Sequence, residues 1–257
     1  MEWCDCHCHL DDASYDGERE QVIERCLQAG VSTLVTVADP YAEESMGKTL
    51  EMSAAHPEIR TVIAAHPHQA SQYSPDVERR IFRFVEQASP VGIGETGLDF
   101  HYHFSPPEDQ RRVLRRQLAI ASELKLPVII HSRQAEAEIL DILQEERFAQ
   151  PVVFHCYTGD MATAQEILRR GHTISISGIV TFKKADDLRR IVETIPLGQL
   201  LTETDSPYLS PEPFRGQTNT PVHVDRVVAA IAAVKMVDVE TIAQAVKKNL
   251  SYLMRGK

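Results

Sequence analysis

Histidines, aspartates and glutamates recur through the sequence in short polar motifs, and each motif follows a run of apolar residues. The carboxyl ends of the strands in a parallel β/α barrel meet at one mouth, where catalytic side chains gather. Imidazole nitrogens and carboxylate oxygens bind zinc and related divalent cations. The sequence therefore predicts a metal site assembled from several strand ends. The motifs are Asp5–His9, Glu95–Asp99, Ile130–Arg133, Phe154–Cys156 and Glu203–Asp205.

The first and last of these motifs predict one half of the site. His7 and His9 lie two residues apart, so both imidazoles project from one side of an extended segment and can reach one ion. Asp205 follows the last apolar run, and in a closed barrel the last strand lies beside the first, so Asp205 can share that ion. Glu203 has two interpretations: it orients a ligand or a water, or it is a buried carboxylate in an ion pair.

The motifs in the middle of the chain predict the other half of the metal site. Glu95 follows the run Val91–Gly94, whose small residues let neighbouring backbones and ions come close. Its two carboxylate oxygens can bridge two cations. His131 and His155 come at the ends of two later apolar runs. Both are interpreted as nitrogen ligands of a second cation, the alternative being core histidines satisfied by their neighbours.

Further polar residues are candidates for substrate contact. His66 and His68 flank Pro67 after the third predicted strand, where they could orient a phosphate or hold an additional ion, or form only a polar loop. Arg133 follows two residues after His131, and Arg215 lies in a long loop near the end of the chain. Either guanidinium could hold a phosphate bidentately.

Strand-like and helix-like segments alternate along the chain, which predicts right-handed parallel crossovers. The expected fold is an α/β (β/α)8 TIM barrel, and a single domain over residues 1–257 fits the usual barrel length of about 250 residues. The competing fold is an open doubly wound sheet. The first predicted strand is not followed by a glycine-rich phosphate loop, and this argues against the competing fold. The predicted strands are Trp3–Cys6, Val31–Val37, Thr61–Ala65, Val91–Gly94, Pro127–Ile130, Val152–Phe154, Thr173–Ile176 and Leu200–Thr202, and two closing helices are predicted at 222–235 and 239–252.

The formal net charge of −10 argues against a protein that coats nucleic acid through a broad basic surface. It is compatible with a nuclease in which cations and a few arginines neutralise one or two phosphates. The sequence shows neither a secretory signal nor an apolar run of about 18 residues, so we expect a cytoplasmic protein without a membrane span. Cys4, Cys6 and Cys8 are expected to share one face as reduced thiols, with metal ligation by Cys6 or Cys8 as the alternative.

In combination, these motifs resemble the TatD family of metal-dependent deoxyribonucleases, a branch of the amidohydrolase-like barrels. The resemblance runs from Asp5 to about Leu253. It implies a barrel that binds two divalent ions, with Glu95 shared between them, and hydrolysis of DNA phosphodiester bonds, in several members from the 3′ end. The ligands that it implies are His7, His9, Glu95, His131, His155 and Asp205. It rests on D-C-H-C-H-L-D from Asp5, H-P-H from His66, G-E-T-G-L-D from Gly94, L-P-V-I-I-H-S-R from Leu126, F-H-C-Y-T-G from Phe154, T-F-K from Thr181 and L-T-E-T-D-S-P-Y-L from Leu201.

One departure from the family pattern is Gln217, which stands in place of a usual lysine and puts one basic substrate contact in doubt. We expect a hydrolase that attacks a phosphodiester with a metal-activated water, with Glu95 and Asp205 as catalytic residues and Asp205 as proton acceptor. The expected ions are zinc, manganese, nickel, cobalt or magnesium, and the expected substrate is single-stranded DNA or frayed ends, with RNA as a second candidate and no obligate protein partner. The rivals are a hydrolase of amides or esters, including deacylation of misacylated tRNA, and a catalytically silent metal-storage protein.

Overall fold

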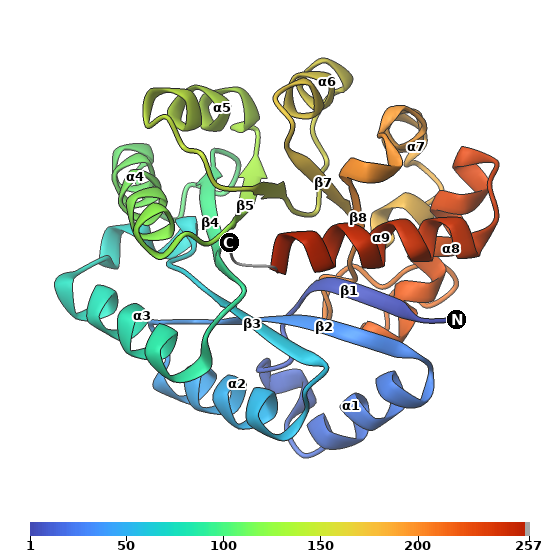
Figure 1. Ribbon diagram of the computed structural model, residues 1–257, viewed down its shortest axis with the longest axis horizontal. Coiled ribbons are helices and arrows are strands. Elements are labelled where there is room, and N and C mark those ends of the chain that lie inside the picture. The colour runs from blue at the N-terminus through green and yellow to red at the C-terminus, as the bar shows by residue number, and fades with distance from the viewer. Residues whose placement is uncertain (255–257) are drawn as a thin grey trace.

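Eight parallel strands form the sheet of the computed structural model, which describes residues 1–254 (Figure 1). Each strand pairs with the next along the chain. The Asp205 N–H donates to the His7 carbonyl at 3.0 Å, which brings the end of β8 against β1. The sheet is thus a nearly closed TIM barrel, and the doubly wound alternative is wrong. Residues 255–257 of the predicted domain lie outside the described residues. The strands are β1 (Trp3–Cys8), β2 (Val31–Ala38), β3 (Ile59–Ile63), β4 (Gly92–Asp99), β5 (Val128–Arg133), β6 (Val152–Phe154), β7 (Thr173–Ile176) and β8 (Leu200–Thr202).

Helices surround the barrel, and the last helix covers one of its two ends. In Figure 1 α9 runs across the opening on the viewer's side. Leu250 and Leu253 of α9 line a small internal cavity together with Val91 and Pro127, which precede β4 and β5. This end therefore lies where strands begin, and the opposite end is the mouth. The helices are α1 (Arg19–Gln28), α2 (Glu43–Ala55), α3 (Pro75–Ala88), α4 (Pro107–Leu124), α5 (Glu136–Glu145), α6 (Met161–Arg169), α7 (Asp186–Thr194), α8 (Val224–Lys235) and α9 (Val239–Met254), with short 3-10 helices η1 (Ala13–Tyr15), η2 (Pro67–Gln72), η3 (Gly178–Thr181), η4 (Leu197–Gln199) and η5 (Pro221–His223).

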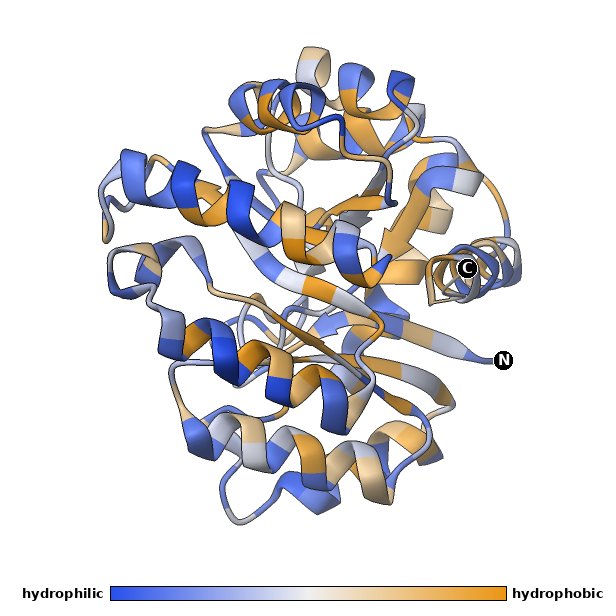
Figure 2. Ribbon diagram, turned by 60° about the vertical axis from the view of Figure 1, so that its left-hand side comes forward, coloured by the Kyte–Doolittle hydropathy of each residue, from blue (hydrophilic) through white to orange (hydrophobic). Residues whose placement is uncertain are grey.

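The helices pack on the barrel through apolar stripes, as the alternation of orange and blue along them shows (Figure 2). On α4, Val113, Leu114 and Leu118 are buried, whereas Arg112 and Arg116 are exposed. This spacing of three and four residues is that of a helix with one face on the core. Each such apolar side chain contributes about 1.5–3 kcal/mol when fully buried. The packing holds the strand ends in fixed relative positions.

β4 is longer than predicted, because its glycines continue the strand instead of ending it. A Cβ at Gly94 would lie 2.5 Å from the Cβ of Ile129 on β5. A Cβ at Gly97 would lie 1.9 Å from the His131 carbonyl oxygen, and Gly97 has a φ of +150°. Only glycine permits this close approach of β4 and β5. Glu95 therefore lies within the strand and not at its end.

The expectation that Cys4, Cys6 and Cys8 share one face is wrong. Cys6 packs in the barrel core and lies 3.0 Å from the Ser175 hydroxyl, while Cys8 packs in a separate cluster with residues of α1. The register of β1 against β2 shifts between Asp5 and Cys8, and this irregularity breaks the simple alternation of a strand. Burial raises the pKa of the Cys6 and Cys8 thiols well above the ordinary range. The ligation alternative is disfavoured, because neither Cys6 nor Cys8 belongs to a cluster of possible metal ligands among the described residues.

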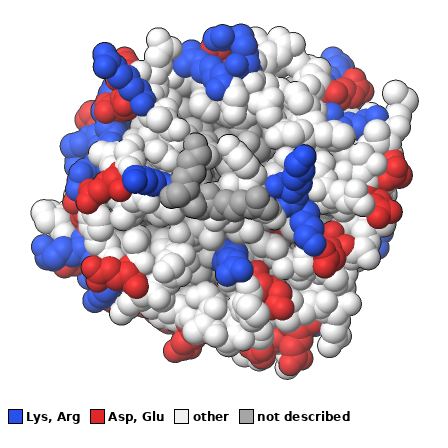
Figure 3. Space-filling view, viewed as in Figure 1, with Lys and Arg blue, Asp and Glu red and all other residues white. Residues whose placement is uncertain are grey.

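Positive and negative side chains are interspersed on the face that carries α9 (Figure 3). This mixture agrees with the net charge of −10, which argued against a broad basic binding surface. Within residues 1–254, every helix is too short or too polar to cross a bilayer.

Candidate metal centre

Glu95 lies at the centre of a cluster of imidazoles at the mouth of the barrel. Its side chain is buried, and its Oε1 lies 2.6 Å from His131 Nδ1 and 2.7 Å from His155 Nε2. The same oxygen lies 3.3 Å from His66 Nε2. Its Oε2 lies 3.4 Å from His7 Nε2. The two oxygens of one carboxylate thus face different histidines, which lie in or after different strands.

The junction of β1 and β8 supplies the other side of the cluster. Asp205 Oδ1 lies 3.4 Å from His9 Nε2 and 3.9 Å from His7 Nε2. Asp205 follows Thr202, the last residue of β8, by three positions and has a φ of +54°, so it is a loop residue and not the end of the strand. The His7 and His155 rings stack with centroids 4.0 Å apart. This stacking joins the two sides of the site.

The donor set fits divalent cations. His7 Nδ1, His7 Nε2 and His155 Nδ1 are buried and lack a hydrogen-bond partner among the described residues. A buried nitrogen without a hydrogen-bond partner lowers the free energy of unfolding unless another group, such as a metal ion, binds it. Ligand atoms within 4.8 Å of one another occur in the sets His7–His9–Glu95, His7–His155–Asp205, Glu95–His131–His155 and His66–His68–His131.

The electrostatics of the site follow from burial and mutual attraction. Burial opposes ionisation of Glu95, but the imidazoles of His155 and His66 outweigh it and hold its pKa well below the usual range. Burial works against the charged form of His9, but Asp205 outweighs it and raises the pKa of His9 to about 9. Burial lowers the pKa of His66 to about 4. Glu95 is thus a carboxylate, and His66 is a neutral imidazole at pH 7.

Asp99 is a carboxylate of this cluster to which the sequence analysis gave no role. It is fully buried, and its Oδ2 lies 3.0 Å from His131 Nε2 and 2.8 Å from His68 Nε2. Such a carboxylate fixes the orientation of an imidazole and raises its basicity. The signal was present in the sequence: Asp99 follows Glu95 by four residues, an even spacing that puts both on one side of an extended strand.

Glu203 and Asp5 are buried carboxylates behind the cluster. Glu203 Oε1 lies 3.4 Å from Nδ1 of His155, so both interpretations stay open: Glu203 orients this imidazole, or it is a buried carboxylate in an ion pair. Asp5 accepts hydrogen bonds from the Thr204 hydroxyl and from the backbone N–H groups of Thr204 and His7. Burial raises the pKa of Asp5 to about 8 in spite of these bonds. Asp5 thereby ties the loop after β8 to β1.

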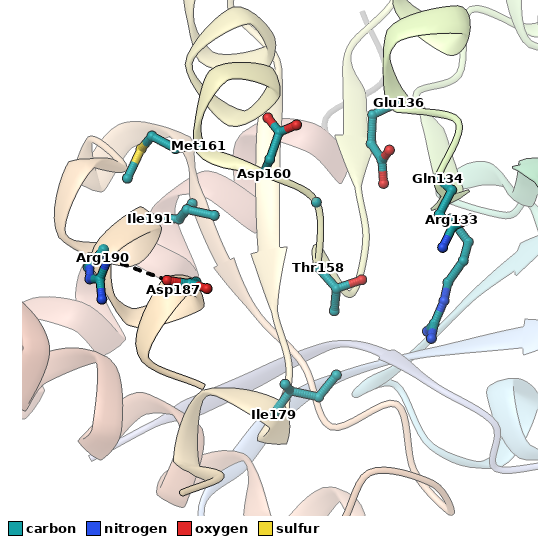
Figure 4. A pocket seen from close by; sticks show the side chains of 11 residues that line it. Arg133, Gln134, Glu136, Thr158, Asp160, Met161, Ile179, Asp187, Arg190 and Ile191 are labelled. Carbon is teal, nitrogen blue, oxygen red and sulfur yellow. Dashed lines mark ion pairs between the residues drawn. The ribbon is translucent and has the colours of Figure 1, made fainter. Parts of the chain in front are cut away.

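The two candidate arginines lie in different surroundings. Arg133 ends β5, and its guanidinium lies 5.7 Å from the centroid of the Tyr102 ring. It also lines an open pocket of about 880 Å³, opposite Thr158 and Ile179 (Figure 4). Arg215 is exposed and stacks on Phe182 with its guanidinium 3.8 Å from the ring centroid. A smaller pocket of about 230 Å³ contains Glu95 itself, together with His9, His66 and Tyr208 among its lining residues.

A parallel barrel whose imidazoles and carboxylates converge at one mouth defines a metal-dependent hydrolase of the TIM-barrel type. The family model described as TatD related DNase matches residues 4–255, and the chain belongs to this family. It is 37% identical to the uncharacterized metal-dependent hydrolase YabD of Bacillus subtilis, over 98% of each chain.

Two further relatives support this assignment. The chain is 34% identical to the 3′-5′ ssDNA/RNA exonuclease TatD of Pectobacterium parmentieri, over 96% of this chain and 97% of the relative. The crystal structure of the TatD homolog YjjV of Escherichia coli superimposes with a TM-score of 0.89 and 29% identity, covering 98% of this chain and 97% of that one. The chain is thus a TatD-type metal-dependent hydrolase.

Proposed function

We propose that this protein shortens single-stranded DNA from its 3′ end by hydrolysing phosphodiester bonds, and that it does so with two divalent cations at the mouth of the barrel. The single observation that carries the proposal is the division of the Glu95 oxygens, because Oε1 faces His131 and His155 while Oε2 faces His7. One carboxylate so placed can bridge two cations. The proposed ligands are His7, His9, Glu95, His131, His155 and Asp205.

The choice of substrate rests on relatives. The proteins of Pectobacterium parmentieri and Citrobacter koseri, 34% and 33% identical to this chain, are named 3′-5′ ssDNA/RNA exonucleases. We carry over the substrate and the polarity from them, with RNA as a second substrate. The site is compatible with this choice, because a mouth beneath loops admits a single strand or a frayed end more easily than a stiff duplex.

The chain's own residues have distinct parts in the reaction. Two cations in this site would supply Lewis acidity and lower the pKa of a bound water. Burial works against ionisation of Asp205, but His9 outweighs it and lowers the pKa of Asp205, so this carboxylate is available as proton acceptor. The neutral His66 and the nearby His68 orient the phosphate. Arg133 and Arg215 neutralise phosphate oxygens.

The proposed cations are zinc, manganese, nickel or cobalt rather than magnesium. Four imidazoles come from His7, His9, His131 and His155. Imidazole suits transition metals such as zinc and nickel, and the carboxylates of Glu95 and Asp205 suit manganese, whereas magnesium prefers an all-oxygen shell and keeps its waters.

The experiment that tests the proposal is a degradation assay with metal-reconstituted protein. Oligonucleotides labelled at the 5′ end, single-stranded or duplex, of DNA or RNA, are expected to show stepwise shortening from the 3′ end, fastest for single-stranded DNA. Cleavage of closed circular single-stranded DNA at the linear rate would replace the exonuclease proposal with an endonuclease. Turnover of acyl substrates such as misacylated tRNA, without turnover of DNA, would replace it with amide or ester hydrolysis.

A further inference from the structure

Two aromatic side chains are exposed beside the metal centre, in the loop between β4 and α4. Tyr102 is 50% exposed and Phe104 is 65% exposed. Their rings are nearly parallel, with an interplanar angle of 7° and centroids 5.6 Å apart. Aromatic rings bring a large gain when they are covered, and neighbouring exposed rings mark a surface that binds a partner.

This loop is attached to the metal centre through Asp99. The Asp99 Oδ1 accepts hydrogen bonds from the backbone N–H groups of His101 and Tyr102, both at 2.9 Å. The Oδ2 of the same carboxylate lies 3.0 Å from His131 and 2.8 Å from His68. One buried side chain therefore holds the aromatic loop and the imidazoles in a fixed relation.

The aromatic pair is one imidazole away from a proposed metal ligand. The His68 ring lies edge-on to Phe104 at 4.8 Å and to Tyr102 at 5.7 Å, and it lies 5.6 Å from the ring of His131. On another side, the guanidinium of Arg133 lies 5.7 Å from the centroid of the Tyr102 ring. A guanidinium that can bind phosphate thus lies beside Tyr102, one of the two rings on which a flat apolar group can stack.

We propose that Tyr102 and Phe104 form a stacking platform for an unpaired nucleobase next to the scissile phosphodiester, with Arg133 contacting the phosphate of the same nucleotide. The proposal rests on the proposed function, and it names the part of the substrate that this surface recognises. Every base has a π-face, so stacking on aromatic side chains tolerates any sequence. A base within a duplex is already stacked, so the platform engages only unpaired bases. This gives the preference for single strands a physical cause.

The test is a cycle that changes the protein and the substrate separately. The variant Tyr102→Ala/Phe104→Ala should lower kcat/KM on a short single-stranded DNA by about 10-fold, mainly through KM. For the wild-type protein, an abasic residue at the terminal or at the penultimate position should cause the same loss. Combining the variant with that abasic strand should add no further loss, because the two changes remove the same contact.

Two variants serve as controls. Tyr102→Phe/Phe104→Tyr keeps both rings and should recover most of the kcat/KM that the double alanine variant loses. Tyr252→Ala removes a similarly exposed ring from α9, at the other end of the barrel, and should have no effect. Metal content and melting temperature of every variant are measured, so that a folding or metal defect is recognised.

Several results would overturn the inference. The double alanine variant could match the wild type, or its loss could be equally large on normal and abasic strands. A wild-type dimer that the double variant dissociates would assign the rings to a protein interface. Each of these leaves DNA cleavage by the wild type intact, whereas a wild type that cleaves no DNA removes the proposed function and this inference together.

Discussion

Glu95 is the residue on which the arrangement of the site depends. Its Oε1 faces His131 of β5 and His155 after β6, and its Oε2 faces His7 of β1. The carboxylate is buried, and burial works against its charge, but the surrounding imidazoles outweigh this effect and lower its pKa. A neutral amide at this position would keep the size of the side chain and lose the charge that attracts cations.

We therefore expect Glu95→Gln to lose metal while the fold remains. Loss of an outer partner of a metal ligand costs about 10–100-fold in affinity or activity, so loss of a bridging ligand should lower activity by more than about 100-fold. Metal content, activity and melting temperature are the measurements. Glu86→Gln, at an exposed position of α3, is the matched control and should behave as wild type. Full activity of a folded Glu95→Gln protein at saturating metal would refute the assignment.

At the scale of the element, β4 determines how close the two central strands come. It carries Glu95 and Asp99, both of which face histidines of the site. Gly97 between them lies against the backbone of His131 on β5. A side chain at this position must push β5 away, and His131 moves with it. A change in the packing of β4 against β5 therefore also changes the geometry of the site.

Gly97→Ala is expected to destabilise the protein and to disturb the site together. The Cβ would lie 1.9 Å from the His131 carbonyl oxygen at a φ of +150°, and we expect a loss of at least about 2 kcal/mol in the free energy of unfolding. Metal affinity should fall as well. Gly47→Ala on α2, where a Cβ meets nothing within 4 Å, should instead stabilise by about 0.5–1 kcal/mol. Denaturant unfolding and metal titration of both variants check this, and equal stability of the two would contradict it.

The turn between α6 and β7 should make stability depend on pH. Burial lowers the pKa of His172 to about 4, whereas the unfolded side chain titrates near about 6.5. The folded pKa is depressed, so the stability from the neutral imidazole is present above pH 6.5 and is lost as the pH falls through about 4. His172→Gln should lose less stability than the wild type between pH 7 and pH 4. Urea unfolding at several pH values measures this, and parallel curves for the two proteins would be evidence against it.

At the scale of the whole molecule, the charge of −10 limits how the protein holds nucleic acid. Acidic and basic side chains are mixed on the face around α9, as Figure 3 shows. For the proposed function we therefore expect binding at the mouth, through cations and a few arginines, and not over a broad surface. The prediction of one domain over residues 1–257 stays a prediction.

We expect a shallow salt dependence of binding to single-stranded DNA. With Arg133 and Arg215 as the phosphate contacts, the slope of log K against log salt should be about −1.4, because each contact to a single strand contributes about −0.7. Arg133→Ala should reduce the slope by about 0.7. Fluorescence titrations at several salt concentrations and constant metal measure it. A slope as steep as that of a protein with 6–10 phosphate contacts would indicate an extended basic binding surface and would contradict binding through two arginines at the mouth.

Local patterns in the sequence determined the order of the strands and the set of residues that meet at the mouth. Apolar runs predicted every strand, with β6, β7 and β8 at their observed bounds. The positions of His7, His131 and His155 at such ends predicted that they lie together, and they do. The spacing of apolar residues and the place of each histidine after an apolar run can be read locally from the sequence. Because a barrel brings the carboxyl ends of all its strands to one mouth, the strand order alone predicted that these histidines lie close together. That these residues bind metal stays a prediction.

Only the tertiary structure decided what depends on distances between strands. The division of the Glu95 oxygens, the double role of Asp99 and the exposure of Tyr102 and Phe104 depend on register and on loop path, which no local pattern contains. The sequence predicted a strand that ends at Gly94, whereas β4 continues through Gly97 to Asp99 in close contact with β5. Cys6 and Cys8 separated because the register of β1 shifts. Spacing determines which residues can meet, but packing determines which atoms face one another.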